Sequence, residues 1–537
     1  MLSLKQWVLK PHFYLAIVIL GSLLKFYHLG YKLFWRDEVS TVLYTSGIKE
    51  KDYLFRVPTN MVTSSNFYDS LLRPSTNPHA ITYEIGQILS DTHLTPGHYV
   101  LLTFWYRLVG DNGIDFRLFS VFVFLLSLPF LFMLAKDLMQ SSLAAWITIS
   151  LFSVSPFINF HAQEARYYPL WVFLFILSNY LFLTAINRNK PIWWVAYSLS
   201  AVLALYTTLL SAAFVFGHLV FITMFHKGLL KRFLLPLLLV FLAYLPWLYF
   251  LLTIRKVIES GLSWQVYDHP NVYTLEYLFF QFLGWSRSFN FLGDGPYYFM
   301  LFSGNLLPEI YLPLTIDVIA LGFIFYALAY FLKNSTSQTK GFLVLIAMPL
   351  FLLIYISDII RNGLVSLMWR YQIVNLVVIM MIVANILKDK LINGKLSFAG
   401  IYLCLIAIGI WSIIKVENLR YWLVPDSPSI INVSKTINLS PNPLIITDFG
   451  GTHGYGFVNF LTVIHEAKNK NADILYCKEP FSEIHETISR KNYSDVFIIQ
   501  STDELVKKFQ ASYGEKLVLF KHEKNAWASI PIWKIKP

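Results

Sequence analysis

Long apolar runs alternate with short polar segments along most of the chain. About eleven of these runs are long enough to predict membrane-spanning helices, because a span needs about 20 mostly apolar residues and hydrocarbon does not tolerate unpaired backbone groups. The runs lie near residues 12–28, 117–136, 142–160, 169–187, 192–207, 209–225, 234–252, 312–332, 342–357, 372–388 and 396–414. The pattern therefore predicts a polytopic α-helical membrane protein with about eleven transmembrane helices.

Lysines and arginines in the short loops predict the orientation of these helices. With eleven spans, the basic residues near the span ends all fall on one side of the membrane, and the positive-inside rule identifies that side as the cytoplasm. These residues are Lys5, Lys10, Lys136, Arg188, Lys190, Lys227, Lys231, Arg232, Lys333, Lys340, Lys388, Lys390 and Lys395. The protein is then predicted to lie in the inner (plasma) membrane of the cell. The long loops 29–116 and 253–311 and the C-terminal tail are on its extracytoplasmic side.

Two regions differ from the spans. Residues 96–110 are apolar, but about 15 residues are too few for a span, so this segment is predicted to be an interfacial helix on the outer membrane surface. Beyond a transmembrane domain of residues 1–420, strand-like runs alternate with helical patterns and predict a small extracytoplasmic α/β domain with a mostly parallel sheet over 425–537. Its strand-like runs are 443–448, 473–477, 495–500 and 517–521, and its helical patterns are 456–468, 481–490 and 502–511.

The composition agrees with a membrane protein. Apolar residues make up 56% of the 537 residues and charged residues only 14%, whereas soluble chains average about 45–50% and about 25%. The net charge of +11 does not require a nucleic-acid partner, because basic residues at the ends of spans produce the same sum. The two cysteines, Cys404 and Cys477, lie in an apolar run and in the polar tail, so we expect no disulfide between them.

The first cluster of candidate chemistry is residues 34–38, which contain Arg36, Asp37 and Glu38 just after the first span. Two adjacent carboxylates beside an arginine can accept a proton, hydrogen-bond a sugar or bind a divalent cation such as Mg²⁺ or Mn²⁺. The alternative is a solvated turn at the membrane edge.

The second cluster is residues 93–99, where His93 and His98 flank the pair Pro96-Gly97. A Pro-Gly pair predicts a turn, and histidines five residues apart can reach a common point. No third ligand stands at metal-site spacing, so no metal site is predicted. The alternative is a set of helix-start residues at the level of the lipid headgroups.

Two further clusters lie at the outer ends of later spans. Residues 161–168 include Glu164, Arg166 and Tyr167, and residues 369–371 include Arg370 and Tyr371. An arginine is a permanent cation whose forked guanidinium suits a phosphate or a carboxylate. The alternatives are an internal pairing of Glu164 with Arg166 and an Arg370 that extends toward the membrane surface.

A weaker signal lies in the tail. Residues 448–456 are rich in glycine, follow a predicted strand and open a helix, which is the place where backbone amides can approach a phosphate. Their spacing matches neither common nucleotide-binding motif, so a tight strand-to-helix turn is the preferred interpretation.

Taken in chain order, these clusters resemble the glycosyltransferase C superfamily, specifically the bacterial relatives of protein O-mannosyltransferases and aminoarabinose transferases. The resemblance covers about residues 10–255 well and 310–390 loosely. It rests on Arg36-Asp37-Glu38, on residues 93–99 and 105–110, on Arg117-Leu118-Phe119-Ser120, on Ser155-Pro156, on residues 163–168, and on Arg370-Tyr371. Each motif alone is weak, and their order is fairly specific.

The resemblance implies an enzyme that moves a single sugar from a polyprenyl-phosphate donor to an acceptor on the outer face of the membrane, usually with inversion. By analogy Asp37 is the general base and Glu38 orients that site. Arg166 and Arg370 are implied to hold the donor phosphate, with Arg36, His93, His98, Glu164, Tyr167 and Tyr371 as further substrate-binding residues. The partners implied are the membrane lipid, the donor, and a glycolipid, polysaccharide or protein acceptor, with no nucleic acid.

The chain departs from these relatives in two places. Many relatives have two prolines where this chain has Pro96-Gly97, and a histidine after the tyrosine at the top of the fifth span, where this chain has Tyr206 followed by Thr207 and Thr208. Any role of that histidine does not transfer to this chain. The tail carries nothing that maps onto the relatives.

Two other functions remain alternatives. A transporter or flippase of a lipid-linked glycan would show pseudo-symmetric halves, broken spans and polar residues at mid-membrane, whereas this chain has its charges at outer helix ends and no visible repeat. A lipid-linked-glycan polymerase or ligase would share the location and the donor, and would differ by transferring a block of sugars.

Overall fold

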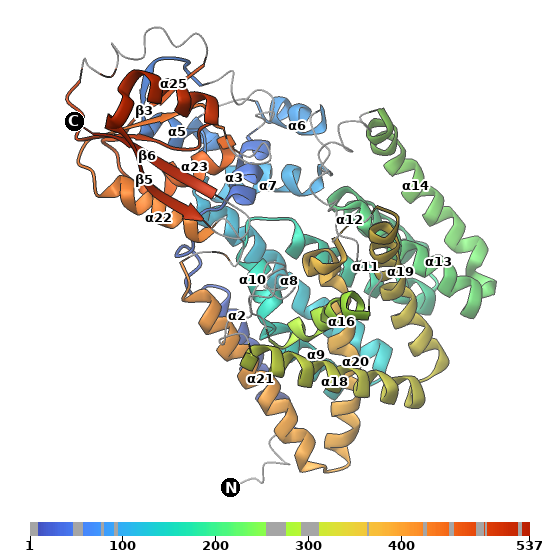
Figure 1. Ribbon diagram of the computed structural model, residues 1–537. Coiled ribbons are helices and arrows are strands. Elements are labelled where there is room, and N and C mark those ends of the chain that lie inside the picture. Colours follow the sequence, from blue (N-terminus) through green and yellow to red (C-terminus); the bar gives the residue numbers. More distant parts are fainter. Residues whose placement is uncertain are drawn as a thin grey trace. The chain divides into compact units, whose positions relative to one another are not determined.

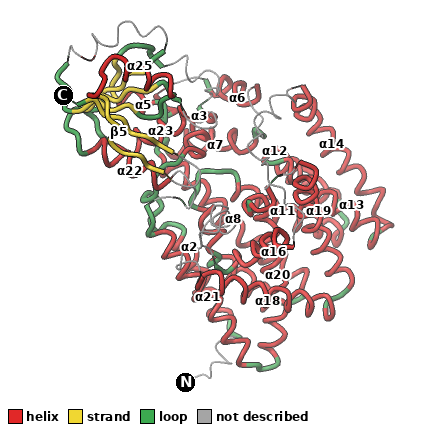
Figure 2. Tube along the Cα trace, in the orientation of Figure 1, coloured by secondary structure: helices red, strands yellow, loops and turns green. Residues whose placement is uncertain are grey.

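The computed structural model describes residues 9–46, 57–76, 80–90, 95–253, 275–290, 311–361, 363, 365–420, 422, 427–450, 456–478, 488, 491–524 and 529–536. The chain forms two compact units (Figure 1). The helical unit contains Met1–Leu29, His93–His98 and Arg117–Asn418, and the mixed unit contains Gly30–Thr92, Tyr99–Phe116 and Leu419–Pro537. Figure 2 shows that the strands belong to the mixed unit.

Each of the predicted spans coincides with helix in the helical unit. Its helices are α2 (Pro11–Leu24), α8 (Gly113–Met139), α9 (Ser142–Ser153), α10 (Pro156–Ala162), α11 (Tyr168–Arg188), α12 (Pro191–Thr207), α13 (Ala212–Phe225), α14 (Leu230–Thr253), α16 (Leu275–Leu283), α18 (Tyr311–Asn334), α19 (Ser337–Arg361), α20 (Ile373–Ile392) and α21 (Leu396–Glu417). In the described part of the chain seven helices are long and apolar enough to cross a membrane, or eight if the bent pair α9–α10 is one span. The apolar stretches Pro11–Leu24, Pro191–Thr207 and Leu209–Phe225 are shorter. The prediction of a polytopic α-helical membrane protein is confirmed.

The third predicted span is broken. Helix α9 ends at Ser153 and α10 begins at Pro156, with a bend of 60° between them. Ser155 has an extended backbone and Pro156 occupies the first position of α10, as expected because a proline disfavours helix at the residue before it and suits a helix start. The break brings the polar residues of α10 into the interior, where Asn159 and His161 are buried.

Close packing of helices α13 and α19 requires a glycine. A Cβ atom on Gly217 would stand 1.9 Å from the carbonyl oxygen of Leu345, so only glycine lets the two backbones approach this closely. Helices α11 and α20 are the most enclosed of the candidate spans, with 78% and 89% of their apolar windows buried, whereas the corresponding value for α14 is 22%. Helices α11 and α20 also contact each other, and they form the interior of the helical unit.

The mixed unit is built on a six-stranded sheet of order β1-β3-β2-β4-β6-β5. Its strands are β1 (Val62–Ser64), β2 (Pro443–Thr447), β3 (Asp473–Tyr476), β4 (Asp495–Ile498), β5 (Leu517–Lys524) and β6 (Ser529–Ile535). Strand β2 is buried along its whole length, as a central parallel strand should be. The sheet is therefore where the tail sequence predicts it, and four of its strands start at predicted positions.

The sheet is mixed and not mostly parallel, so that part of the prediction was wrong. The pairs β2–β3 and β2–β4 are parallel, but β1–β3, β4–β6 and β5–β6 are antiparallel. The reason is that a C-terminal hairpin forms one edge and a strand from the first long loop forms the other. The tail also contributes α22 (Ser427–Asn438), α23 (Gly456–Ala467) and α25 (Asp503–Tyr513). The helical pattern predicted at 481–490 falls outside the described residues, apart from residue 488.

The first long loop is largely folded. It contains α3 (Arg36–Thr45), α5 (Ser65–Ser70), α6 (Ile81–Ser90) and α7 (Gly97–Val109). The segment predicted as an interfacial helix is α7, which is 13 residues long. Its Tyr106 hydroxyl and Arg107 guanidinium contact the buried carboxylate of Glu84 in α6 at 2.8 and 2.7 Å, which joins the two helices of the loop.

Candidate functional site

An arginine–tyrosine cluster, made of Arg166, Tyr167, Arg370 and Tyr371, lies where helices α11 and α20 begin. Arg166 and Tyr167 directly precede α11, and Arg370 and Tyr371 lie in the 3-10 turn η9 (Trp369–Gln372), which directly precedes α20. Each guanidinium lies near the ring of the tyrosine that follows it, 5.8 Å from the centroid of Tyr167 and 5.6 Å from that of Tyr371. An Arg-Tyr pair thus stands just ahead of each of the two most enclosed candidate spans in the described part of the chain.

The members of this cluster interact electrostatically with Tyr167. Burial raises the pKa of the Tyr167 hydroxyl, nearby Tyr371 raises it further, and the cations Arg166 and Arg370 oppose the shift. The ring of Tyr167 lies 4.4 Å from that of Tyr168, the first residue of α11. The side chains of Arg166 and Arg370 are partly exposed. The structure therefore brings together two predicted cations and two predicted tyrosines that are about 200 positions apart in sequence.

His98 belongs to the same neighbourhood. Its side chain is only 1% exposed, and burial together with the charge of Arg166 lowers its pKa to about 3. The imidazole is therefore neutral at physiological pH and can serve as a hydrogen-bonding group but not as a cation. His93, the other histidine of this motif, lies outside the described residues.

The turn before His98 packs on the end of α12. The Thr95 hydroxyl donates to the carbonyl of Thr207 at 2.6 Å, and a Cβ atom on Gly97 would stand 2.6 Å from the carbonyl oxygen of Tyr206. The Pro96-Gly97 pair thus fits a close backbone contact that a bulkier residue would obstruct. The top of α12, where many relatives carry a histidine, is held here by backbone and threonine contacts.

The Glu164 carboxylate is buried and contacts a neighbouring histidine within its own turn. It is 1% exposed, and its Oε2 lies 2.8 Å from Nδ1 of His161, which is equally buried. The Ser120 hydroxyl donates to the Glu164 carbonyl at 2.6 Å, and the Gln163 amide donates to the carbonyls of Leu24, Lys25 and Tyr27. These contacts fix the turn that presents Arg166.

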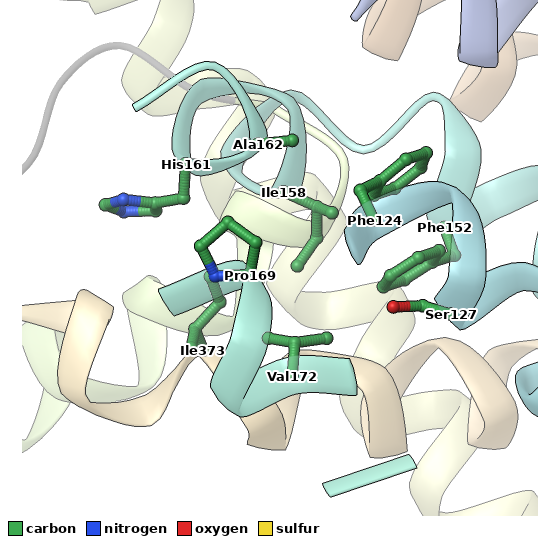
Figure 3. Close-up of a pocket in the computed structure, with 9 residues that line it drawn as sticks. All are labelled: Phe124, Ser127, Phe152, Ile158, His161, Ala162, Pro169, Val172 and Ile373. Carbon is green, nitrogen blue, oxygen red and sulfur yellow. The ribbon is translucent and has the colours of Figure 1, made fainter. Parts of the chain in front are cut away.

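A small cavity lies beside this turn (Figure 3). It is lined by Phe124, Ser127, Phe152, Ile158, His161, Ala162, Pro169, Val172 and Ile373. The volume open to the centres of water molecules is about 10 Å³, which is room for roughly one water. Figure 3 shows His161 at one edge of the lining and the two phenylalanines together on another side. The cavity is too small for a sugar, so we interpret it as a packing gap between the helices.

A buried ion pair that the sequence motifs do not identify lies beside Trp369, the residue before Arg370. Arg287 and Asp317 are each 2% exposed at the side chain and lie 3.1 Å apart, and the guanidinium lies 4.4 Å from the ring of Trp369. Asp317 also accepts hydrogen bonds from Ser286 and Asn290, both at 2.9 Å. The signal in the sequence was the aspartate inside an apolar run, because an intramembrane acid requires a partner.

The predicted carboxylates lie in the mixed unit, at the first turn of α3. Glu38 is fully buried and its carboxylate accepts the backbone N–H of Trp35 at 3.4 Å, while the Glu38 N–H donates to the Trp35 carbonyl at 2.9 Å. Asp37 is about one-quarter exposed and lies 3.7 Å from Arg36 Nε. The adjacent carboxylates thus differ in use: Glu38 caps the helix, and Asp37 is accessible at its N-terminus, where the helix dipole favours an anion.

Each of the two carboxylates has a neighbour within its own turn of the chain. Glu38 is engaged in the cap of its own helix, and Asp37 has a neighbouring cation in Arg36. Among the residues that the structure describes, no group of three or more His, Cys, Asp and Glu side chains could hold a metal ion.

The glycine-rich segment of the tail is a tight turn where it is described. Asp448 accepts the backbone N–H groups of Gly450 and Thr502 at 2.8 and 2.9 Å. A Cβ atom on Gly450 would stand 2.2 Å from the Thr502 nitrogen. These contacts give Asp448 and Gly450 a role in the fold of the turn. Residues 451–455 fall outside the described part of the chain.

Comparisons with known proteins find similarity only among solved structures. No protein-family model matches the chain, and no curated protein matches it. The structure of ArnT from Cupriavidus metallidurans in the apo state is 12% identical, with a TM-score of 0.47 over 93% of this chain and 97% of that chain. The same protein bound to undecaprenyl phosphate is 11% identical, with a TM-score of 0.48 over 97% of each chain.

An oligosaccharyltransferase from Archaeoglobus fulgidus, tethered with an acceptor peptide, is 10% identical, with a TM-score of 0.45 over 97% of this chain and 74% of that chain. Because the identities and TM-scores are low and a fold does not define an activity, the function below is argued from the residues of this chain.

Proposed function

We propose that this chain is an integral-membrane glycosyltransferase that moves a single sugar from a polyprenyl-phosphate donor to an acceptor on the outer face of the membrane. The observation that carries the proposal is the arginine–tyrosine cluster. Two permanent cations stand at the beginnings of the two most enclosed apolar helices, which suits a ligand with an anionic head and a long apolar tail. A lipid phosphate has this chemistry.

Arg166 and Arg370 hold the donor phosphate in this mechanism. When the bond between the sugar and the phosphate oxygen breaks, negative charge grows on the phosphate, and fixed guanidinium groups stabilise that charge more in the transition state than in the ground state. The buried contacts of Glu164 and Gln163 hold the turn that carries Arg166, and the pair Arg287–Asp317 supports the segment that carries Arg370. His98, Tyr167 and Tyr371 contribute uncharged hydrogen-bonding groups.

Asp37 acts as the general base. It takes the proton of the acceptor hydroxyl while the acceptor oxygen bonds to the anomeric carbon and the polyprenyl phosphate leaves with its electron pair, so a single displacement inverts that carbon. Glu38 orients Asp37 by capping helix α3. Arg36 lies beside the base, with its Nε 3.7 Å from the Asp37 carboxylate.

The test uses the purified full chain in lipid nanodiscs with a panel of radiolabelled polyprenyl-phosphate monosaccharides. We expect release of the sugar from one donor by the wild type. Asp37→Asn should lose transfer by about 10²-fold or more, because general-base catalysis contributes roughly 10²- to 10⁴-fold, and should still bind the donor.

The matched control is Asp503→Asn, which changes an aspartate in the first turn of α25 in the same unit and should leave transfer unchanged. Normal turnover by Asp37→Asn would remove Asp37 as the base. A wild type that consumes none of the donors would reject the proposed function.

A further inference from the structure

Residues 32–38, which lead into helix α3 and include Asp37, are enclosed by side chains of the C-terminal tail. Lys32, Leu33, Phe34 and Trp35 are each at most 6% exposed. Helix α3 packs against helix α23 of the tail, and both belong to the mixed unit (Figure 1). The segment just before the proposed base therefore contacts residues more than 380 positions away along the chain.

Two hydrogen bonds hold this segment, one to the backbone N–H and one to the backbone carbonyl of Leu33. The Leu33 N–H donates to the Arg420 carbonyl at 2.8 Å, and the Trp422 indole N–H donates to the Leu33 carbonyl at 2.9 Å. Trp422 is fully buried, and its ring lies 6.4 Å from that of Trp35, the residue that caps α3. The Lys32 ammonium lies 5.3 Å from the centroid of the Trp422 ring.

Arg420 is in turn anchored on helix α23. Its guanidinium forms an ion pair with Glu466, whose side chain is 8% exposed. The neighbouring His465 contacts the ring of Phe34 edge-on at 5.8 Å between centroids and pairs with Asp69 of α5 at 2.7 Å. A continuous set of contacts thus runs from α23 through Arg420 and Trp422 to Leu33 and Trp35, just before α3.

We infer that the C-terminal tail is a positioning element for the base: Arg420 and Trp422, anchored through Glu466, determine where Asp37 stands at the start of α3. This inference rests on the proposed function of Asp37. Arg420 and Trp422 are positioning residues, since they act through Leu33 and Trp35. A displacement of a reacting group by about 1 Å can cost roughly 100-fold in rate, so a loss of these contacts affects turnover before it affects donor binding.

The test is a charge exchange in the full chain, measured in nanodiscs. Arg420→Glu and Glu466→Arg each place like charges together and should lower kcat by about 10- to 100-fold, with the KM for the donor changed by less than about threefold. The double variant with both substitutions restores the pair and should recover most of kcat. Trp422→Ala should behave like the single charge variants.

A second measurement, hydrogen–deuterium exchange over residues 33–45, is independent of activity. Exchange should rise in each single variant and return in the double variant. The control is Lys491→Glu, which breaks the exposed ion pair with Asp473 in the same domain and should change neither kcat nor exchange at α3.

The outcomes separate this inference from the proposed function. Wild-type kcat in Arg420→Glu and Trp422→Ala, or a kcat that the double variant does not recover, overturns the inference while the transferase activity stands. If the wild type transfers no sugar, the proposed function fails. The exchange data alone then decide whether Arg420 and Trp422 hold the start of α3. Unchanged exchange in the single variants overturns that contact, and raised exchange supports it.

Discussion

The guanidinium groups of Arg166 and Arg370 are the residues on which the proposed donor site most depends. Hydrogen bonds to a charged group contribute about 1.5–3 kcal/mol, so Arg166→Ala and Arg370→Ala should each weaken binding of undecaprenyl phosphate by roughly 10- to 100-fold. Lysine at either position should restore only part of the affinity, because it lacks the planar fork. Binding to protein in nanodiscs measures the effect.

Arg188→Ala is the control for this prediction. Arg188 ends α11 at the opposite end from Arg166 and stacks on Trp193 at 4.9 Å, so its loss should leave the affinity unchanged. Equal affinity of Arg166→Ala and the wild type would exclude Arg166 from the phosphate site.

The buried His98 makes stability depend on pH. Its pKa is lowered to about 3 by burial and by Arg166, whereas an unfolded histidine titrates near about 6.5. Below that value the unfolded chain binds a proton that the folded chain excludes, so stability should fall by at most about 1.4 kcal/mol per pH unit on acidification. Above about pH 7 the contribution should be constant.

Thermal unfolding in detergent between pH 7.5 and 5 measures this slope. His98→Gln keeps a polar side chain without a titration in this range and should unfold with a shallower pH dependence. Parallel pH curves for the two proteins would show that His98 does not set the slope.

At the scale of elements, the packing of helices α13 and α19 depends on Gly217. Alanine would bring a Cβ atom to 1.9 Å from the backbone of Leu345, and overpacking of a close contact costs typically about 1–3 kcal/mol. Gly217→Ala should therefore lower the melting temperature measured in detergent, although alanine favours the helix by about 1 kcal/mol.

Gly322→Ala provides the matched comparison. Gly322 lies within α18 and has open space around its Cα, so alanine there should leave the melting temperature unchanged or raise it slightly. A Gly217→Ala variant as stable as Gly322→Ala would contradict the close contact.

The sequence predicts the elements of the helical unit well because a span is a local property of composition. Every predicted run coincides with helix. The paired residues Arg287 and Asp317 could not be assigned from the sequence, since their contact depends on how η6 (Gly284–Ser288) folds back against α18. Arg166 and Arg370 were both identified as cations at outer helix ends, but only the packing of α11 on α20 makes them neighbours.

At the scale of the whole molecule, the loop charges predict which side of the membrane each segment occupies. Single cysteines placed at Lys190, Lys227 and Lys508, in a chain with Cys404 and Cys477 replaced, should report this orientation. A membrane-impermeant maleimide should label position 508 in spheroplasts but label 190 and 227 only after the membrane is permeabilised. Labelling of 190 from outside would reverse the proposed orientation.

The mixed unit shows where prediction from local patterns fails. The tail sequence identifies most of its strands, but nothing in the three residues of β1 marks them as an edge strand of a sheet formed by the other end of the chain. The same holds for residues 420–422, whose partner Leu33 lies at the start of the first loop. Long-range pairing of this kind depends on tertiary context rather than on local propensity.

The pairing of β1 with β3 has a consequence for biosynthesis. Thr63 and its partner Ile474 are 411 residues apart, and at about 5–20 residues per second the ribosome needs on the order of 20–80 s to make the intervening chain. Throughout that interval the loop that carries Asp37 is already made, yet its edge strand has no partner, and Leu33 has none until Arg420 and Trp422 are made. A nonsense mutation just before Arg420 should therefore give a product that retains Asp37, Arg166 and Arg370 but never matures into an active enzyme.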